Sequence, residues 1–316
     1  MQKILHMAIL STVLLGGVQQ ATAADTPQIT SISAEDGEKQ LAQSFSVAAD
    51  ARIEIDNVRG SVTVTAWDQP QVQLSGSLGA GSKLEISADP QHLALQVKGT
   101  RGRWFGGDGP PSDSDLVLKV PRGAALKLGV VSADAKVQGM RGKSLDVNGV
   151  SGNLVLDSDA AEIDVNSVSG DVTFSASRPN ASGRAHLQTV SGNVHVHGLG
   201  GRIKLETVSG DIGLDGGDVQ ELETGTVSGD AKLQVTPGPH ARLVMSSMSG
   251  DIRLHLPAAL SGHFEAKTFS GDIMSDFGKP QESAHGSGST LDARIGDGDA
   301  QIRAESFSGD VELRKQ

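Results

Sequence analysis

The sequence contains no cysteine and no tyrosine, and only two of its 316 residues are tryptophan. A chain without cysteine has no disulfide and no thiolate metal ligand, so its stability must come from side-chain burial and backbone hydrogen bonds. Aromatic residues make up 3% of the chain, which leaves few large side chains to fill a core. These absences exclude a disulfide scaffold and disfavour a single spherical core.

The sequence also lacks an apolar run long enough to span a bilayer comfortably. The apolar segment at residues 4–18 follows Lys3 and precedes the small residues Ala21 and Ala23. A positive residue, a short apolar segment and a small-x-small site together predict a secretory signal peptide over residues 1–23. We therefore expect cleavage near Ala23 and a periplasmic or secreted mature protein without a transmembrane segment.

Positive charge is in deficit, with 27 basic residues against 38 acidic ones and a formal net charge of −11. A negative chain repels phosphate backbones and anionic membrane surfaces. The charge balance therefore argues against nucleic acid as a partner.

Glycine is abundant, with 40 residues, and many of them lie in near copies of one motif. Residues 207–214 read TVSGDIGL, and the chain repeats this stretch as SVSGDVTF, TVSGNVHV, TVSGDAKL, SMSGDIRL and SFSGDVEL. Apolar residues alternate with others around the motif, as in Ile203, Leu205, Val208 and Ile212. The alternation predicts half-buried strands, and we expect the step from Leu205 to Val208 to be a parity change where the chain rounds a corner.

The Ser-Gly-Asp or Ser-Gly-Asn element of each copy has the composition of a tight turn. Glycine adopts positive φ without strain, and the serine and acidic or amide side chains hydrogen-bond nearby backbone groups. We expect these residues to form a structural turn ladder. Its members are Ser151, Gly152, Asn153, Ser169, Gly170, Asp171, Ser191, Gly192, Asn193, Ser209, Gly210, Asp211, Ser228, Gly229, Asp230, Ser249, Gly250, Asp251, Ser270, Gly271, Asp272, Ser308, Gly309 and Asp310.

The turn serines between Ser132 and Ser270 recur every 18 to 22 residues, and the longer intervals coincide with longer variable turns such as residues 177–183. A unit of about 20 residues that cannot bury its apolar face alone is typical of a stacked repeat. The sequence predicts an all-β protein, specifically a parallel β-solenoid of roughly nine two-strand coils in which each coil pairs with the next.

The chain divides into four predicted parts. After the signal peptide, residues 24–44 are polar and aperiodic, which predicts a flexible lead-in. Residues 45–121 contain alternating segments that mostly lack the turn motif, so we expect an N-terminal β-strand unit and insertion that caps the exposed edge of the stack. Residues 122–316 carry the solenoid repeats, interrupted by a loop at 276–290.

The turns, the segment KVP at 119–121, the stretch LHLPAALSGHFEAKTFSGDI at 254–273 and the terminal SFSGDVEL resemble the bacterial putative-adhesin β-strand-repeat family. That family is a domain of unknown function found in envelope proteins. The resemblance covers about residues 45–313 and implies a repeat architecture in the cell envelope. It supplies no catalytic residues, because the family has none assigned.

Two clusters are candidate sites outside the turns. His195 and His197 share an outward face, and the repeat register places Asp215 beside His197, so the three could bind Zn²⁺ or Cu²⁺. The alternative is a pair of exposed histidines on a polar sheet face.

The second candidate is a glycine- and proline-rich loop that holds Arg101, Arg103, Trp104 and Phe105. Exposed arginine with aromatic residues has the composition of an interaction hot spot, and the alternative is an insertion that folds back onto a sheet.

A glycan-active β-helix enzyme would need paired acids in a unique cleft and aromatic sugar platforms. Here the acids repeat at equivalent turns, and the chain has little aromatic content. We therefore predict a non-catalytic envelope protein without a cofactor, an adhesin or interaction scaffold whose partner is an unidentified envelope protein or glycan. The alternatives are a periplasmic metal- or ligand-binding module and, second, the glycan-active enzyme.

Overall fold

The computed structural model describes residues 28–35, 37–99, 111–178, 181–282 and 288–316. Within these ranges all regular elements are strands, which confirms the all-β prediction. No helix in the described ranges is long and apolar enough to cross a membrane. The strands are β1 (Gln28–Ala34), β2 (Lys39–Ser46), β3 (Arg52–Trp67), β4 (Gln71–Leu78), β5 (Ser82–Ala88), β6 (His92–Gly99), β7 (Ser114–Pro121), β8 (Ala125–Met140), β9 (Ser144–Ser151), β10 (Leu154–Ser158), β11 (Glu162–Ser169), β12 (Val172–Ser175), β13 (Ala181–Ser191), β14 (Val194–His197), β15 (Leu199–Ser209), β16 (Ile212–Ser228), β17 (Ala231–Ser249), β18 (Ile252–Leu256), β19 (Gly262–Ser270), β20 (Ile273–Ser275), β21 (Gln281–Glu282), β22 (Ser289–Ile295), β23 (Ala300–Ser308) and β24 (Val311–Lys315).

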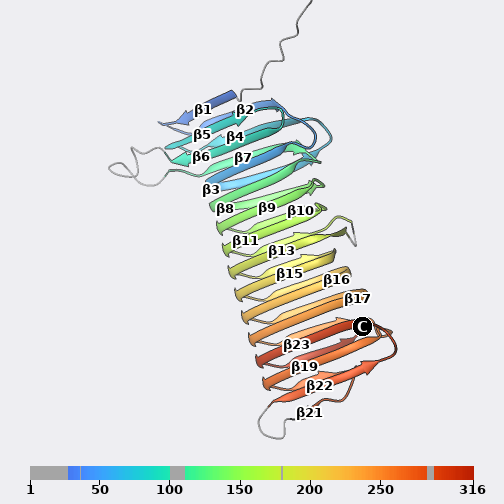
Figure 1. Ribbon diagram of the computed structural model, residues 1–316. Coiled ribbons are helices and arrows are strands. Elements are labelled where there is room, and N and C mark those ends of the chain that lie inside the picture. The colour runs from blue at the N-terminus through green and yellow to red at the C-terminus, as the bar shows by residue number, and fades with distance from the viewer. Residues whose placement is uncertain (1–27, 36, 100–110, 179–180, 283–287) are drawn as a thin grey trace, which may run out of the picture.

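The repeats lie one upon another as layers of an elongated body (Figure 1). Each repeat supplies one strand before its Ser-Gly-Asp turn and one after it, and each strand pairs in parallel with its equivalent in an adjacent layer. Ser191 pairs in register with Ser209 before the turn, and Val196 pairs with Leu214 after it. Equivalent residues of successive repeats therefore form columns along the stack.

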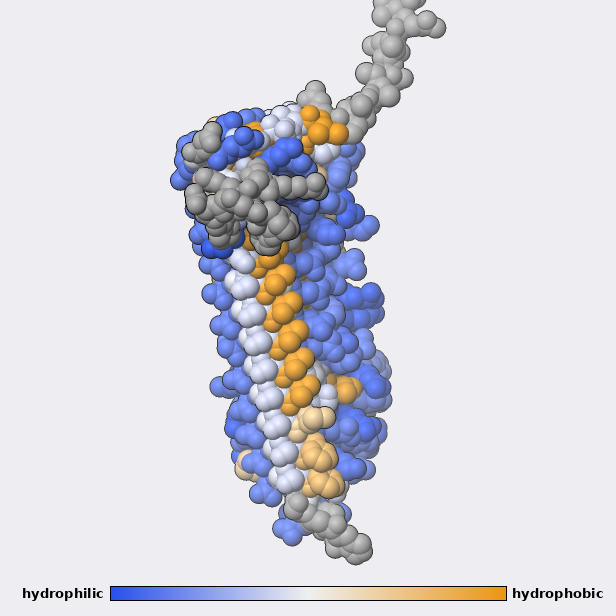
Figure 2. Space-filling view, turned by 90° about the vertical axis from the view of Figure 1, so that its left-hand side faces the viewer, coloured by the Kyte–Doolittle hydropathy of each residue, from blue (hydrophilic) through white to orange (hydrophobic). Residues whose placement is uncertain are grey.

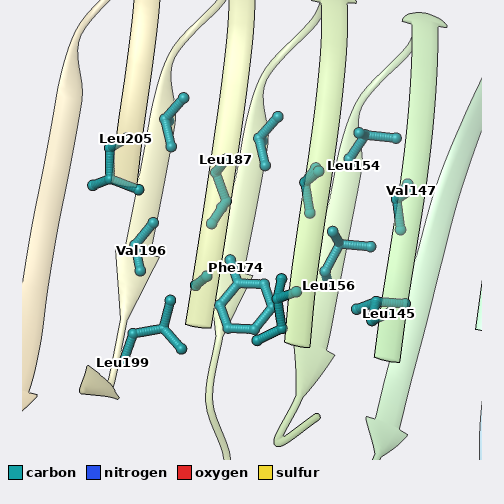
Figure 3. Packing of buried hydrophobic residues seen from close by; sticks show 14 of the residues in the cluster. Leu145, Val147, Leu154, Leu156, Phe174, Leu187, Val196, Leu199 and Leu205 are labelled. Carbon is teal, nitrogen blue, oxygen red and sulfur yellow. The ribbon is translucent and has the colours of Figure 1, made fainter. Parts of the chain in front are cut away.

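The core lies between the strands that precede the turn and the strands that follow it. Leu187 and Leu205 come from the first set, and Leu154, Phe174 and Val196 come from the second (Figure 3). All five side chains are almost completely buried. Burial of apolar surface contributes about 25 cal/mol per Å², so small aliphatic side chains repeated in every layer replace the few large aromatic residues of the chain as the source of stability.

The last repeat does not occupy the end of the stack. Ser308 of β23 pairs with Ser249 of β17 on one side and with Ser270 of β19 on the other. Strand β24 likewise pairs with both β18 and β20. The expectation that each coil pairs with the next is therefore wrong here, because β22 returns antiparallel along the outer side of β19 before the turn at Gly296 leads into β23.

Strands also close the N-terminal end, where residues 24–44 were expected to form a flexible lead-in. Within that range β1 pairs antiparallel with β5, and β2, which extends to Ser46, pairs antiparallel with β4. Residues 45–121 contain β3 to β7, and β3 pairs in parallel with β8 along residues 52–65, so β3 begins the stack. The added strands pair with backbone groups that the open edge of a stack would leave free.

Each turn glycine contacts the backbone of an adjacent layer. Gly210 has a φ of +146°, and a Cβ atom at this position would lie 2.1 Å from the carbonyl oxygen of Gly192. A side chain here is thus disfavoured twice, by the backbone conformation and by the neighbouring layer.

We predict that Gly210→Ala lowers the free energy of unfolding by about 2–4 kcal/mol, because the methyl group forces the layers apart at a strained φ. Gly225→Ala is the matched control, since its nearest contact is the Ser246 hydroxyl oxygen at 3.7 Å and its φ is not positive. Urea unfolding followed by circular dichroism measures both. Equal stability of the two variants would contradict the layer contact.

Candidate functional site

A continuous line of exposed apolar side chains runs along the turn edge of the stack (Figure 2). These residues immediately precede the turn serines, and each exposes between 44% and 64% of its surface. We call this set the apolar ladder. In order along the stack it comprises Val131, Val150, Val168, Val190, Val208, Val227, Met248, Phe307 and Phe269.

The apolar ladder overturns the predicted parity change. A change of parity before the turn would place Val208 in the core with Leu205, but Val208 is 45% exposed and Thr207 is 4% exposed. The strand instead keeps its alternation up to the turn, and the chain changes direction only around Gly210. The polar residue is therefore inside the stack, and the apolar residue is outside it.

The buried hydroxyl groups beside the apolar ladder form a second column. The hydroxyl oxygens of Ser167, Thr189, Thr207, Thr226 and Ser247 have no hydrogen-bond partner among the described residues. Burying an unpaired hydroxyl group costs about 1–3 kcal/mol, while an exposed valine forgoes the stabilisation that burial would supply. At the equivalent positions, the hydroxyl groups of Thr268 and Ser306 donate to the carbonyl oxygens of Gly271 and Gly250, so the column contains hydroxyl groups with and without a partner.

The acidic residues of the turns connect the layers through hydrogen bonds. The backbone N–H of Asp211 donates to Oδ1 of Asn193 at 2.9 Å, and that of Asp230 donates to Oδ1 of Asp211 at 2.8 Å. Because asparagine and aspartate both offer Oδ1, either residue serves at this position. Equivalent bonds along the stack link Asp134, Asn153, Asp171, Asn193, Asp211, Asp230, Asp251, Asp310 and Asp272.

The histidine cluster is placed as the repeat register predicts. His197 Nδ1 lies 3.4 Å from Asp215 Oδ2, whereas His195 pairs in register with Gly213. In the described part of the chain, no three His, Asp or Glu side chains are grouped so as to hold a metal ion. The three residues therefore form an exposed His-Asp pair with a neighbouring histidine, and their binding of a metal ion stays a prediction.

The predicted interaction residues Arg101, Arg103, Trp104 and Phe105 lie outside the described residues. Their role stays a prediction.

A buried carboxylate and two arginines form a charged cluster at the corner of the layers opposite the Ser-Gly-Asp turns. The sequence pattern did not predict this cluster. The side chain of Asp159 is 1% exposed, and its Oδ2 lies 3.2 Å from Nε of Arg141 and 3.1 Å from Nε of Arg178. Burial raises the pKa of Asp159, but hydrogen bonds from the backbone and side chain of Arg178 and the charges of both arginines lower it more. The net pKa lies below the ordinary value, so the carboxylate stays charged and ties three layers together.

Because its folded-state pKa is depressed, Asp159 stabilises the fold above its ordinary pKa of 3.8, and this contribution is lost as the pH falls through the lower folded value. We predict that Asp159→Asn lowers the free energy of unfolding by about 1–2 kcal/mol at neutral pH and that the deficit shrinks below about pH 4. Urea unfolding at a series of pH values measures this difference in free energy. Asp297→Asn, which alters an exposed carboxylate, is the control. A deficit that does not change with pH would contradict the assignment.

A substitution in the buried hydroxyl column should raise the free energy of unfolding, whereas Asp159→Asn lowers it. Thr207→Val replaces an unpaired buried hydroxyl group with a methyl group of similar size, so we expect the free energy of unfolding to rise by about 1 kcal/mol. Val208→Thr, which alters an exposed methyl group, should change it by less than about 0.5 kcal/mol. Thermal unfolding of the two single variants tests this. Destabilisation by Thr207→Val would show that the hydroxyl group is hydrogen-bonded.

Comparison with solved structures finds similar proteins from Parabacteroides and Bacteroides. A putative adhesin from Parabacteroides distasonis ATCC 8503 is 16% identical, with a TM-score of 0.48, and the match covers 88% of this chain and 98% of that one. A putative adhesin from Bacteroides fragilis NCTC 9343 is 12% identical, with a TM-score of 0.43 and coverage of 89% and 99%. A putative lipid binding protein from P. distasonis is 12% identical, with a TM-score of 0.34 and coverage of 89% and 98%.

A search of the curated proteins finds no match to this chain. A family model described as Toastrack DUF4097 matches residues 51–314, nearly all of the described chain, and confirms the resemblance inferred from the turn motifs. The chain belongs to the Toastrack DUF4097 family, a domain of unknown function.

Proposed function

We propose that this chain is a non-catalytic interaction scaffold of the cell envelope, built as a parallel β-solenoid of roughly nine two-strand coils. The observation that carries the proposal is the apolar ladder, which exposes apolar side chains to water in every layer from β8 to β19. Contiguous exposed apolar surface that runs from layer to layer, and is not scattered singly, marks an interaction site.

The stack makes the apolar ladder a rigid surface. In-register pairing on both sides of the turns fixes each ladder residue relative to its neighbours, as Ser191 and Ser209 show. Valine has one strongly restricted side-chain torsion, so a partner would find most ladder side chains already ordered. Less conformational entropy is then lost on binding, which favours affinity for a given area.

The predicted signal peptide at residues 1–23 supports the envelope location in this proposal. An adhesive role, in which the apolar ladder contacts another molecule of the envelope, is its finer form. The turn acids support a structural role for the Ser-Gly-Asp edge, because their Oδ1 atoms accept hydrogen bonds from the adjacent layer.

The test uses co-sedimentation of the mature chain with isolated cell envelopes. We expect the triple variant Val168→Thr, Val190→Thr, Val208→Thr to bind at least about tenfold more weakly, because each substitution exposes a hydroxyl group where the partner meets a methyl group. The double variant Val117→Thr, Val155→Thr alters valines that are 43% and 46% exposed on β7 and β10, outside the apolar ladder, and it should bind normally.

Circular dichroism of each variant establishes that the stack is intact. Equal binding by the triple variant and the wild-type chain would overturn the apolar ladder as the functional surface.

A further inference from the structure

We infer that the apolar ladder is the interface of a homodimer, in which the ladders of two copies of this chain pack against each other. The inference rests on the proposed function, because it names the partner of the same surface. Three properties of the surface lead to a second copy: its period, its charge and its extent.

The period of the apolar ladder is set by the layers. Val168, Val190 and Val208 precede serines that pair in register, so neighbouring ladder residues are about 4.8 Å apart, and the whole ladder extends on the order of 40 Å. A partner that covers it must present apolar groups with the same spacing over the same distance. A second copy has this spacing by construction, and a twofold axis brings two identical surfaces together.

One flank of the apolar ladder carries little net charge. Because the chain has a formal net charge of −11, two copies can meet only where few unpaired carboxylates face each other. Turn serines lie on one side of the ladder. On the other side, the outward residues two positions before the ladder are uncharged in most layers, as at Gly129, Asn148, Asn166, Gln188, Gly225 and Ser246.

The charged exceptions on this side have partners of opposite charge. Oε2 of Glu206 lies 3.2 Å from Nε2 of His186, and its Oε1 lies 3.1 Å from Nζ of Lys204. Glu305 pairs in register with Lys267. The strip on this side of the apolar ladder is thus close to neutral, unlike the chain as a whole. On the other side, the uncharged turn serines separate the ladder from the turn acids, whose Oδ1 atoms accept hydrogen bonds from the adjacent layer.

The extent of the apolar ladder suits a stable dimer. With about half of each side chain exposed, the ladder offers apolar area on the order of 700 Å², close to the roughly 800 Å² that each partner buries in a standard interface. At one end, Phe269 and Phe307 stack with ring centroids 4.8 Å apart and remain 64% and 57% exposed. Exposed aromatic side chains that are held in place are typical anchors of an interface.

The test measures the oligomeric state of the mature chain by sedimentation equilibrium over a range of concentrations. We expect a dimer for the wild-type chain and for the control Val117→Thr, Val155→Thr. The triple variant Val168→Thr, Val190→Thr, Val208→Thr should raise the dissociation constant by about 100-fold, since six methyl groups leave the interface. Circular dichroism reports whether each variant is folded.

The absence of cysteine in the natural sequence permits a second measurement. Ser209→Cys, beside the middle of the apolar ladder, should form an intermolecular disulfide under mild oxidation, and Val155→Cys, equally exposed on the strands after the turn, should not. Ser270→Cys, at one end of the stack, cross-links if the two copies run parallel and does not if they run antiparallel. Either orientation supports the homodimer, provided that Ser209→Cys cross-links.

Two results would overturn the homodimer: a wild-type chain that is monomeric up to about 100 µM without a Ser209→Cys cross-link, and a triple variant that dimerises like the wild type. A monomeric chain that co-sediments with phosphatidylcholine vesicles through the apolar ladder would identify lipid as the partner of this surface. That result would also overturn the homodimer. The proposed function fails separately, when the ladder variants bind envelopes normally. A monomeric chain whose envelope binding needs the apolar ladder keeps that function and loses the dimer.

Discussion

The structure depends on the close contact of turn glycines between adjacent layers. At Gly210 the backbone lies so near the carbonyl oxygen of Gly192 that no side chain fits, and this geometry recurs at the equivalent glycines of the other turns. Because the corners superimpose, every position of the repeat becomes a column along the molecule. One column is the aliphatic core, another is the series of Oδ1 hydrogen bonds, and a third is the apolar ladder.

This arrangement separates stability from recognition. Inward columns and backbone pairing hold the layers together, so the outward columns are free to vary without loss of the fold. A repeated sequence then creates long linear surfaces in place of a single pocket. The surface of this chain accordingly has a regular spacing along its length, and a binding partner with the same spacing can contact many layers at once.

The fold class, the turns and the contact between His197 and Asp215 could be predicted from sequence, because strand alternation and repeat spacing are local signals. The exposure of Val208 could not, since hydropathy favours valine inside and threonine outside. The small polar residue two positions before most turn serines, as at Thr207, was the available signal. The position of β23 between β17 and β19 was also beyond reach, because a repeat period says nothing about the spatial order of the layers.

The inserted position of β23 and β24 makes one end of the stack depend on strands that come later in the chain. These strands follow β19 and β20 in the chain, yet β19 and β20 contact the rest of the stack through them. A chain that lacks β23 and β24 would leave a vacant layer inside the stack, with apolar surface exposed on both sides of the gap. Proteases would cleave such incomplete molecules in preference to complete ones, because only the incomplete molecules expose this apolar surface.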